Sequence, residues 1–383
     1  MLDPRMPTLA QMKRQQRKQL KQIKSYAEGG NGEINRQRLA KAMEGYLNSR
    51  TVRALAIAEV EKVPDNEACS RINALRTQMD QNLHWKEALA SCDRRISWHY
   101  QPKSYLGVRQ VCSLPQPLKA WNIIIKRVIA ATHTVGPHIA DWRGRGRDHH
   151  VQQIAEVLTR PNLSVVIADV KDAFGSVAPD ALYQFLNLPD DLIRGAIDAR
   201  FFAFSHDVEK SRREVLSHYP QYRLRPQGAP PQGLLQGSPT SNAIFSVLLN
   251  DLPDQLSENI GCFVYCDNII VVTETQQSAL AVRKSLVEYF IRHPAGPFTL
   301  PVEIRSLARD GFDHLGYSFR WLRGQPWIGM SEKNSDSFFS RLEEPPSEGL
   351  GGMDYLEACF SSCTPQAISD YTFTAMEHDQ RYW

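Results

Sequence analysis

Two aspartates stand at the ends of short apolar segments. Asp169 closes the run LSVVIADV (163–170), and Asp267 lies between the segments GCFVY and NIIVV. A carboxylate beside apolar residues is costly unless it binds a metal or a strong donor. Two carboxylates brought together repel each other unless a cation lies between them, and oxygen ligands beside phosphate substrates suit Mg²⁺. Either aspartate alone would indicate a helix cap or a turn, whereas the pair predicts a divalent-metal site.

The segments that must position these aspartates alternate between strand and helix patterns. Val- and Ile-rich runs predict a buried strand and a hairpin with Asp267 at its tip. A stretch rich in Gly and Pro separates them and opens an apolar helix. The predicted elements are a strand over 163–170, helices over 179–186, 240–252 and 281–293, the hairpin over 261–272, and a strand pair over 312–321.

The N-terminal part of the chain has a helical pattern that changes near residue 94. The segment 12–24 has long straight-chain side chains and no helix breaker, and the segments 38–63 and 68–92 place apolar residues at helical spacing. An alternating segment that follows, with a turn near 104–107, predicts a hairpin over 94–114. A helix over 119–133 and the Gly/Arg loop WRGRGRDHH (142–150) come next.

The net charge of +3 hides an asymmetry. Residues 1–160 carry 27 Lys and Arg against 14 Asp and Glu, while residues 161–383 carry 18 against 28. Such a split indicates a half that binds a polyanion and a half that concentrates carboxylates, and the alternative is solvated surface charge. The basic segment Lys13–Lys24 is open to the same two interpretations, RNA binding or solvation.

Membrane, secretory and zinc-binding classes are not indicated. No apolar run reaches the roughly 18 residues of a membrane span, and the N-terminus lacks the apolar core of a signal peptide. Seven cysteines, an odd number, do not indicate a disulfide framework, so we expect a cytoplasmic protein. The pairs Cys262/Cys266 and Cys359/Cys363 fit core packing better than zinc, and Asp148-His149-His150 fits a template-contacting loop better than a metal site.

Four ordered segments resemble the palm motifs of reverse transcriptases. They are IADVKDAFGSV (167–177), PQGLLQGSPTSNAIFSVLL (231–249), FVYCDNIIVV (263–272) and GFDHLGYSF (311–319), which are similar to motifs A, B, C and E. Upstream, KSYLGVRQVCSLP (103–115) and WRGRGRDHHVQQI (142–154) resemble the fingers motifs. The resemblance covers about residues 94–320.

The resemblance implies an α+β fold of the right-hand polymerase type. A helical N-terminal extension would occupy 1–93 and the fingers 94–160. The palm, with its antiparallel sheet, would span 161–320 and contribute an insertion at about 188–225 to the fingers. A small helical thumb would take 321–383, a segment too short for an appended nuclease.

The resemblance also implies a two-metal site. Asp169, Asp267 and the Val170 carbonyl would hold two Mg²⁺ ions, with Mn²⁺ as the alternative, and Asn268 would stand beside them. One ion would activate the primer 3′-hydroxyl and the other would neutralise the triphosphate.

Further residues would bind the nucleotide and the nucleic acid. Phe174 would exclude a ribose 2′-hydroxyl and so favour deoxynucleotides, with core packing as the alternative. The other nucleotide-binding residues would be Lys103, Arg109, Asp172, Ala173, Gln236 and Gly237. The template and the primer would be contacted by Arg143, Arg145, Arg147, Leu315 and Gly316.

Two departures from the family pattern concern the chemistry. Asn268 stands where the family usually has a second aspartate, which removes one negative charge from the site. The segment PVEIRSLARDG (301–311) lacks the lysine that usually serves as a general acid. Arg305 is the nearest cation, but a guanidinium is a poor proton donor at neutral pH.

These features predict an RNA-directed DNA polymerase, with an RNA template, deoxynucleotides and a DNA product as partners. By elimination the chain resembles stand-alone bacterial reverse transcriptases of antiphage defence, which copy a structured non-coding RNA. Two alternatives stay open: untemplated or protein-primed synthesis by the same site, and a non-catalytic nucleic-acid-binding module. An oligomer or a partner protein also stays open, and no membrane association is expected.

Overall fold

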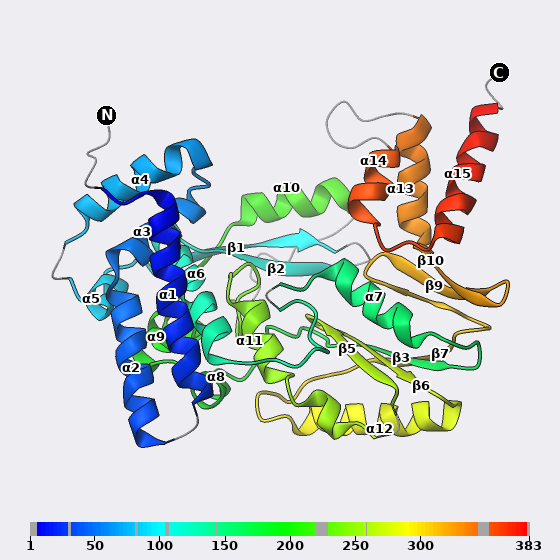
Figure 1. Cartoon of the computed structure of the whole chain (residues 1–383), viewed down its shortest axis with the longest axis horizontal. Helices are drawn as coiled ribbons and strands as arrows, with labels where there is room; N and C mark the ends of the chain where they lie inside the picture. The colour runs from blue at the N-terminus through cyan, green and yellow to red at the C-terminus, as the bar shows by residue number, and fades with distance from the viewer. Residues whose placement is uncertain are drawn as a thin grey trace. The chain divides into compact units, whose positions relative to one another are not determined.

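The computed structural model describes residues 6–29, 32–80, 83–103, 107–142, 144–219, 229–257, 259–343 and 352–380. The fold is mixed α+β, and its described strands form three small sheets (Figure 1). The chain divides into two compact units. The first unit comprises Met1–Val135, Asp172–Leu249 and His293–Pro297, and the second comprises Gly136–Lys171, Asn250–Arg292 and Phe298–Trp383. Within the described ranges, no helix has the length and apolarity needed to cross a bilayer.

The first unit begins with helices, as the sequence predicts for residues 1–93. These are α1 (Leu9–Glu28), α2 (Glu33–Asn48), α3 (Arg50–Val60), α4 (Asp65–Gln78) and α5 (Trp85–Ala90). Later helices of the unit are α6 (Gln116–Thr132), α8 (Pro179–Phe185), α9 (Asp190–Ala196), the 3₁₀ helix η1 (Ala199–Phe201), α10 (Val208–His218) and α11 (Ser241–Leu248).

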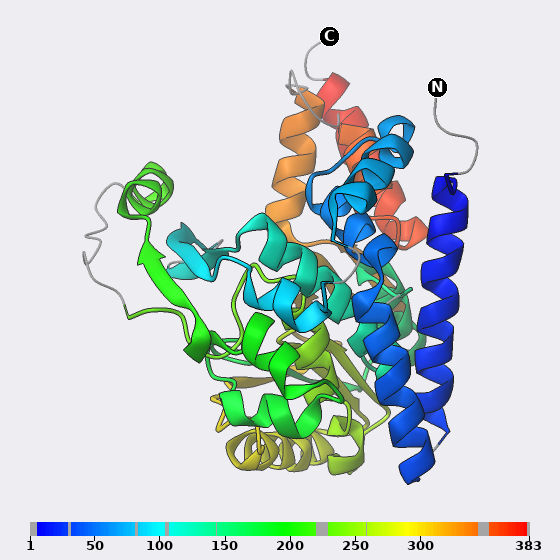
Figure 2. The same ribbon diagram turned by 90° about the vertical axis from the view of Figure 1, so that its left-hand side faces the viewer.

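Helix α1 shows how the sequence sets these elements. Thr8 and Gln11 form a capping box that satisfies the first backbone N–H groups. Met12, Leu20 and Ile23 are buried along one side of the helix, and the six basic residues of the segment 13–24 are exposed. Helices α1 and α2 lie side by side (Figure 2).

The helical pattern over 38–63 is divided in two at Ser49. Its side chain accepts a hydrogen bond from the Val52 N–H and so starts α3 as a separate helix. Apolar periodicity alone does not reveal such a break, because α2 and α3 continue the same three-to-four spacing on either side of it.

The sheet of the first unit has the strand order β2-β1-β4. Strands β1 (Arg95–Pro102) and β2 (Val108–Ser113) pair antiparallel, which confirms the predicted hairpin. Strand β4 (Ala203–His206) pairs with β1 in parallel. A segment about one hundred residues away along the chain therefore completes the sheet that carries the hairpin, as expected for a parallel pair, which needs a long crossover.

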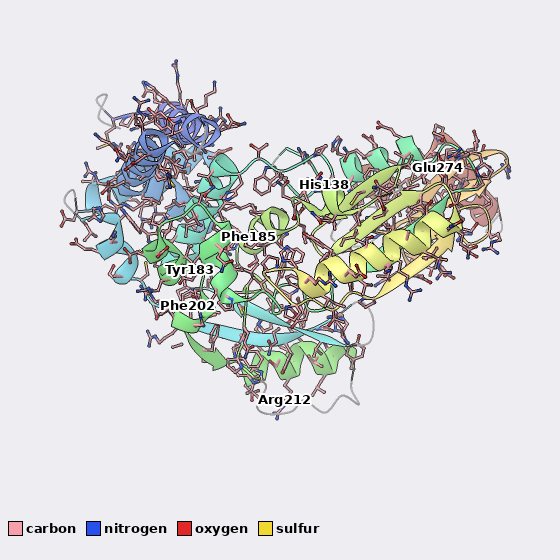
Figure 3. The ribbon with its side chains drawn as sticks, turned by 90° about the horizontal axis from the view of Figure 1, so that it is seen from below. His138, Tyr183, Phe185, Phe202, Arg212 and Glu274 are labelled. Carbon is pink, nitrogen blue, oxygen red and sulfur yellow. The ribbon has the colours of Figure 1, made fainter. Side chains whose placement is uncertain are left out.

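The main sheet of the second unit is antiparallel, with the order β5-β6-β3-β7. Its strands are β3 (Ser164–Asp169), β5 (Gly261–Tyr265), β6 (Asn268–Thr273) and β7 (Val302–Ser306). Helix α7 (Arg147–Val157) lies over one face and α12 (Gln276–Arg292) over the other (Figures 1 and 3). Because both faces are covered, β3 and β6 are nearly continuous apolar runs.

The end of the second unit contains a smaller sheet and three helices. The elements are β8 (Phe312–His314), β9 (Tyr317–Leu322), β10 (Gln325–Met330), α13 (Glu332–Glu343), α14 (Gly352–Cys359) and α15 (Pro365–Gln380), with the 3₁₀ helix η2 (Leu252–Gln255) earlier in the unit. Within residues 321–383, predicted as a small helical thumb, β10 extends this sheet before α13, α14 and α15 follow. The apolar side chains of Phe338, Leu356 and Phe360 are buried in the same core as this sheet.

Candidate active site

Asp169 and Asn268 are directly opposite each other across the main sheet of the second unit. Strands β3 and β6 pair over six residues, and this pair is the last of the register. Opposed residues of an antiparallel pair project from the same face, with Cβ atoms about 5 Å apart. Asp169 is exposed and Asn268 is half-buried, so the pair lies at the solvent-facing end of a buried sheet.

Asp267 occupies the two-residue turn between β5 and β6. Tyr265 pairs with Asn268, which leaves Cys266 and Asp267 as the loop. Cys266 has a φ of 54°, an uncommon value for a residue other than glycine that a tight hairpin turn requires. The Val170 N–H donates to the Asp267 carbonyl over 2.9 Å. The backbone therefore holds the turn against the end of β3.

Polar contacts around the turn orient its side chains. The Asn268 amide donates to Asp267 Oδ1 over 3.0 Å, so Asn268 fixes the neighbouring carboxylate. The Cys266 thiol donates to Asp141 Oδ2 over 3.3 Å. Burial, and then Asp141, raises the pKa of this thiol.

Asp141 is a carboxylate at the turn that the sequence reasoning missed. The Ala140 N–H donates to the Val264 carbonyl over 2.8 Å, and Ile139 bridges to Val264 in parallel, which brings this segment beside β5. The only indication in the sequence is an acidic residue at the start of the Gly/Arg loop. The local sequence pattern does not show that this loop lies beside β5.

The donor set fits Mg²⁺ better than a softer metal. Asp169 and Asp267, at the end of β3 and in the adjoining turn, supply carboxylate oxygens. Among the residues that the structure describes, no three His, Cys, Asp or Glu side chains converge as a ready-made metal cage. Proteins commonly bind Mg²⁺ through one or two carboxylates, and substrate phosphates and water complete its coordination. The residues present therefore fit a Mg²⁺ ion that binds together with its substrate.

In the first unit, the loop that carries Phe174 packs against the Gly-rich segment before α11. The Leu234 N–H donates to the Phe174 carbonyl over 2.8 Å. Gly233 has a φ of 59°, and a Cβ atom there would collide with the same carbonyl, so only glycine allows this approach. The Phe174 ring is half-buried and meets Phe245 edge-on at 5.9 Å. One edge of the ring is thus packed, and part of it remains accessible.

Asp172 begins this loop, and Ala173 follows it in a buried position. Asp172 has a φ of 49° and an exposed side chain. Desolvation raises the pKa of the Asp172 carboxyl, and both Lys103 and the Gly175 N–H act against this rise. Asp172 and Lys103, both predicted to bind the nucleotide, are therefore close enough for their charges to interact.

Gln236 and Gly237 lie against strand β2. The Cys112 N–H donates to the Gln236 carbonyl over 2.7 Å. Gly237 has a φ of 102°, and a Cβ atom there would lie 2.5 Å from the Cys112 carbonyl oxygen. The glycine is therefore required for the loop to approach the hairpin that carries Arg109.

Lys103 and Arg109 are exposed on that hairpin. The Lys103 N–H donates to the Gly107 carbonyl over 3.0 Å, and Arg109 pairs with Gln101 across the strands. Their backbones are fixed by the ladder, but their long side chains extend into solvent.

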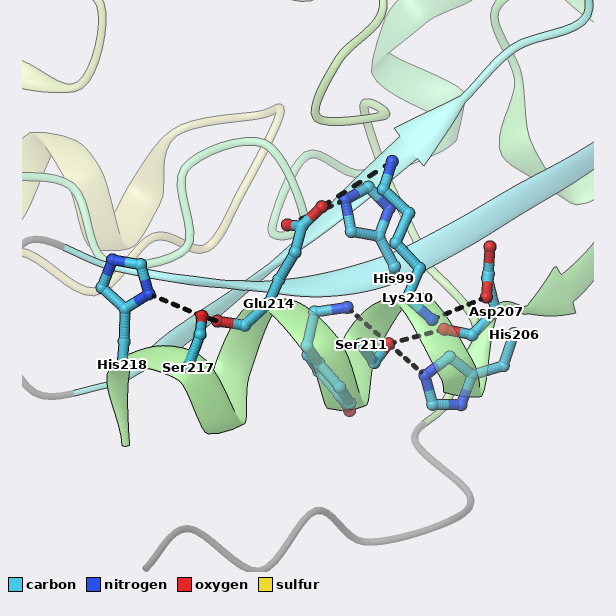
Figure 4. A network of polar contacts seen from close by, with 9 residues as sticks. His99, His206, Asp207, Lys210, Ser211, Glu214, Ser217 and His218 are labelled. Atoms are coloured by element: carbon cyan, nitrogen blue, oxygen red, sulfur yellow. Dashed lines mark hydrogen bonds and ion pairs between the residues drawn. The ribbon is translucent and has the colours of Figure 1, made fainter. Parts of the chain in front are cut away.

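A polar network holds β1 of this hairpin to α10 (Figure 4). The Ser211 hydroxyl, fully buried, accepts from the Tyr100 N–H over 2.9 Å and lies 2.9 Å from His206 Nε2. His99 Nε2 lies 3.4 Å from Glu214. Desolvation and Lys210 lower the pKa of His99 despite the attraction of Glu214. Ser211 is enclosed, so this arrangement supports the hairpin and is not a nucleophile with its base.

The three arginines of the predicted template-binding loop differ in position. Arg143 lies outside the described residues. Arg145 donates to the carbonyls of Gly136 and Ile139 over 2.6 and 2.7 Å. These contacts give Arg145 a structural role, and template binding by the loop stays a prediction.

Arg147 is directed into the second unit. It donates to the Cys359 carbonyl, and its guanidinium lies 5.3 Å from the centre of the Tyr317 ring and 5.1 Å from that of Phe360. Asp148 beside it accepts from the Tyr317 hydroxyl over 2.8 Å. Arg147 therefore joins α7 to the end of the chain, which makes it a weaker candidate for phosphate contact than its position in the sequence indicates.

His150 and His314 form a buried pair in the same region. Their Nε2 atoms are 2.9 Å apart, and the residues are 0% and 6% exposed. Burial is the main cause that lowers the pKa of both imidazoles; the charge of His149 adds to the shift of His150, and the charge of His150 adds to that of His314. The expectation that Asp148-His149-His150 forms a template-contacting loop is wrong for His150. No disulfide joins any of the seven cysteines, which all lie within the described part of the chain.

Leu315 and Gly316 form the two-residue turn between β8 and β9. Their φ values are 51° and 85°, as the tight turns favoured in hairpins require. Asn334 and the Ser331 N–H donate to the Gly316 carbonyl over 3.0 and 2.8 Å. The predicted primer-contacting turn is therefore held rigidly on α13.

Compared with models of known protein families and with curated proteins, the sequence matches none of them.

Proposed function

We propose that this protein is an RNA-directed DNA polymerase. The observation that carries the proposal is the register that sets Asp169 opposite Asn268, with Asp267 in the adjoining turn. Two carboxylates at one end of an antiparallel sheet are an arrangement suited to metal-dependent nucleotidyl transfer. The proposal extends the α+β fold to a right-hand polymerase with fingers, palm and thumb.

The chain's own residues have separable roles in this proposal. Asp169 and Asp267 bind the cations, and Asn268 holds Asp267 in its orientation. When bound, Mg²⁺ lowers the pKa of the primer hydroxyl and neutralises the developing charge on the phosphates. Phe174 excludes the 2′-hydroxyl, and Lys103 and Arg109 bind the triphosphate through charge-assisted hydrogen bonds.

A non-catalytic nucleic-acid-binding module is the second candidate. It is favoured by Asn268, which donates a hydrogen bond where a second carboxylate would bind metal, and by Arg305, whose guanidinium is paired with Glu303 at 2.5 Å. Antiphage defence and the copying of a structured non-coding RNA stay predictions from the sequence resemblance.

Primer extension separates these candidates. The purified chain is incubated with deoxynucleotides, a primed RNA or DNA template, and Mg²⁺ or Mn²⁺, with Asp169→Asn as the control. Template-dependent extension that EDTA and Asp169→Asn abolish supports the proposal. Binding of the primed template without extension in either metal contradicts it and favours the module. Product made without regard to template sequence indicates untemplated synthesis.

A further inference from the structure

A cavity of about 230 Å³ lies within the first unit, between α5, the residue before β1, and α9. Trp85 and Leu89 form its apolar wall and are 3% and 2% exposed. Lys86, Arg94 and Arg194 line it together with one carboxylate, Asp191. Three cationic side chains and one anionic side chain give the lining a net positive charge, and the apolar wall strengthens its field.

Arg94 is the least satisfied of these cations. Its Nε is buried and has no hydrogen-bond partner among the residues that the structure describes. Its Nη2 lies 3.6 Å from the point where a Cβ atom of Gly195 would stand, so the guanidinium lies close to the backbone of α9. A buried donor without an acceptor is destabilising, and an anion in the cavity would remove that penalty.

The other two cations are held in place by neighbours. Lys86 is 2.6 Å from Asp191 and 5.7 Å from the centre of the Trp85 ring. The Arg194 guanidinium lies 5.3 Å from the centre of the Phe201 ring. Asp191 shares Lys86 with any incoming anion and so limits its affinity. Lys86, Arg194 and Asp191 are exposed, so these charges lie where an anion can reach them from solvent.

The size and the donors of the cavity select the ligand. Pockets that enclose drug-sized molecules measure about 300–1,000 Å³, so this cavity suits a small group. Arginine binds phosphate oxygens bidentately. A phosphate monoester carries more negative charge than the Asp191 carboxylate and can therefore compete with it for Lys86. We propose that this cavity binds a phosphate monoester, carried by a nucleotide or by the 5′ end of a nucleic acid. The inference goes beyond the polymerase site and does not rest on it.

Calorimetric titration of the full chain with inorganic phosphate tests the site. Arg94→Gln is compared with Arg95→Gln, a matched change at an exposed neighbour that is paired with Asp93 and does not line the cavity. We expect Arg94→Gln to weaken binding about ten-fold, which corresponds to about 1.4 kcal/mol, and Arg95→Gln to leave it unchanged. Equal affinity in the two variants, or equal binding of acetate at the same ionic strength, would overturn the proposal.

Asp191→Asn provides a test that does not remove a packed side chain. Because it removes the competing carboxylate and releases Lys86, we expect phosphate to bind several-fold more tightly. Unchanged or weaker binding would contradict the site, even if Arg94→Gln failed to fold.

Two further ligands identify the source of the phosphate. Oligonucleotides of one sequence, with a 5′-phosphate or a 5′-hydroxyl, are titrated beside a nucleoside 5′-monophosphate. A preference for the phosphorylated oligonucleotide over both others, lost in Arg94→Gln, indicates a nucleic-acid end. Equal affinity for the mononucleotide indicates a free nucleotide. Absence of any preference for the 5′-phosphate contradicts the proposal, whatever primer extension gives.

Discussion

The proposed metal ligands and the proposed triphosphate ligands are positioned in different ways. Asp169, Asp267 and Asn268 stand at the ends of paired strands, where the ladder and a two-residue turn fix their backbones and a hydrogen bond fixes Asp267. Lys103 and Arg109 stand on an exposed hairpin, and only their backbones are fixed. The carboxylates are preorganised, whereas the cations must be ordered by a ligand.

This difference indicates how each group should respond to substitution. Removing a preorganised metal ligand should abolish the reaction, because it removes a charge that would coordinate the cation directly. Removing a flexible cation should weaken substrate binding by a smaller factor. The interaction with substrate is partly offset by the conformational entropy that the long side chain loses when it binds. The predictions below test that ranking.

The largest effect is expected for the carboxylates. Asp169→Asn and Asp267→Asn should each lower Mg²⁺-dependent DNA synthesis more than about 1,000-fold, since metal coordination supplies several kcal/mol of transition-state stabilisation. Single-turnover extension rates measure this loss. Asp254→Asn, an exposed carboxylate on η2, is the control, and a similar loss there would indicate a general effect on folding.

A smaller effect is expected for the ring near the sugar. Phe174→Ala should raise the efficiency of ribonucleotide incorporation relative to deoxynucleotide incorporation about 10- to 100-fold, because steric discrimination in a pocket is worth that much. The ratio of the two kcat/KM values is the measurement. Phe245→Leu, which keeps a buried apolar side chain but removes the ring that packs on Phe174, should change the ratio far less, and an equal change would assign Phe174 to the core.

The exposed cations should affect binding rather than rate. Arg109→Gln should raise the KM for deoxynucleotides about ten-fold, the worth of one charge-assisted hydrogen bond, and leave kcat within about two-fold. Lys103→Gln should do the same to a lesser degree. If either variant lowered kcat as strongly as the aspartate variants, the contrast between fixed and flexible ligands would be lost.

Asn268→Asp tests the departure in the turn. The change replaces the amide that donates to Asp267 with a second carboxylate. Because the two carboxylates repel each other, the site should bind a cation more tightly. We expect half-maximal activity at a Mg²⁺ concentration a few-fold lower, with Asn268→Ala shifting it in the opposite direction. An unchanged Mg²⁺ profile in both variants would place Asn268 outside the metal site.

The smallest effect concerns the buried histidine pair. The folded state keeps His150 and His314 neutral, while the unfolded chain protonates them below about pH 6.5. The contribution of the pair to the free energy of unfolding is therefore fully present above about pH 6.5. It should fall by up to about 1 kcal/mol per histidine between pH 6.5 and pH 5.5. Urea unfolding between pH 7.5 and 5.5 measures this slope, which His150→Gln should reduce and the exposed His149→Gln should not.

Local patterns predicted the elements at the candidate site, but not the register that pairs them. The Val- and Ile-rich runs of β3 and β6 indicated buried strands, and the short Cys266-Asp267 interval indicated a hairpin. Both features are encoded over a few residues, which is why the sequence showed them. The pairing of β3 with β6, which sets Asp169 opposite Asn268, joins segments about one hundred residues apart, and the local patterns did not show it.

Features that depend on distant contacts were not visible in the sequence. Arg147 was expected to contact a template because it stands in a Gly/Arg loop, yet its guanidinium is directed toward Cys359, more than 200 residues away along the chain. Asp141 approaches Cys266 through a bridge to β5, and His150 meets His314 through the packing of α7 on β8. In each case the partner is selected by the tertiary fold, which no local spacing records.

The division of the chain between the two units has a consequence for how the protein is made. Each unit is assembled from three separate segments, and the central strand β3 pairs with β6 and with β7, which follow it by about one hundred residues or more. During synthesis on the ribosome, the apolar run of β3 therefore emerges long before either neighbour and must be kept from associating with other chains. No single truncation point yields either unit complete, so fragments of this protein should depend on chaperones or aggregate.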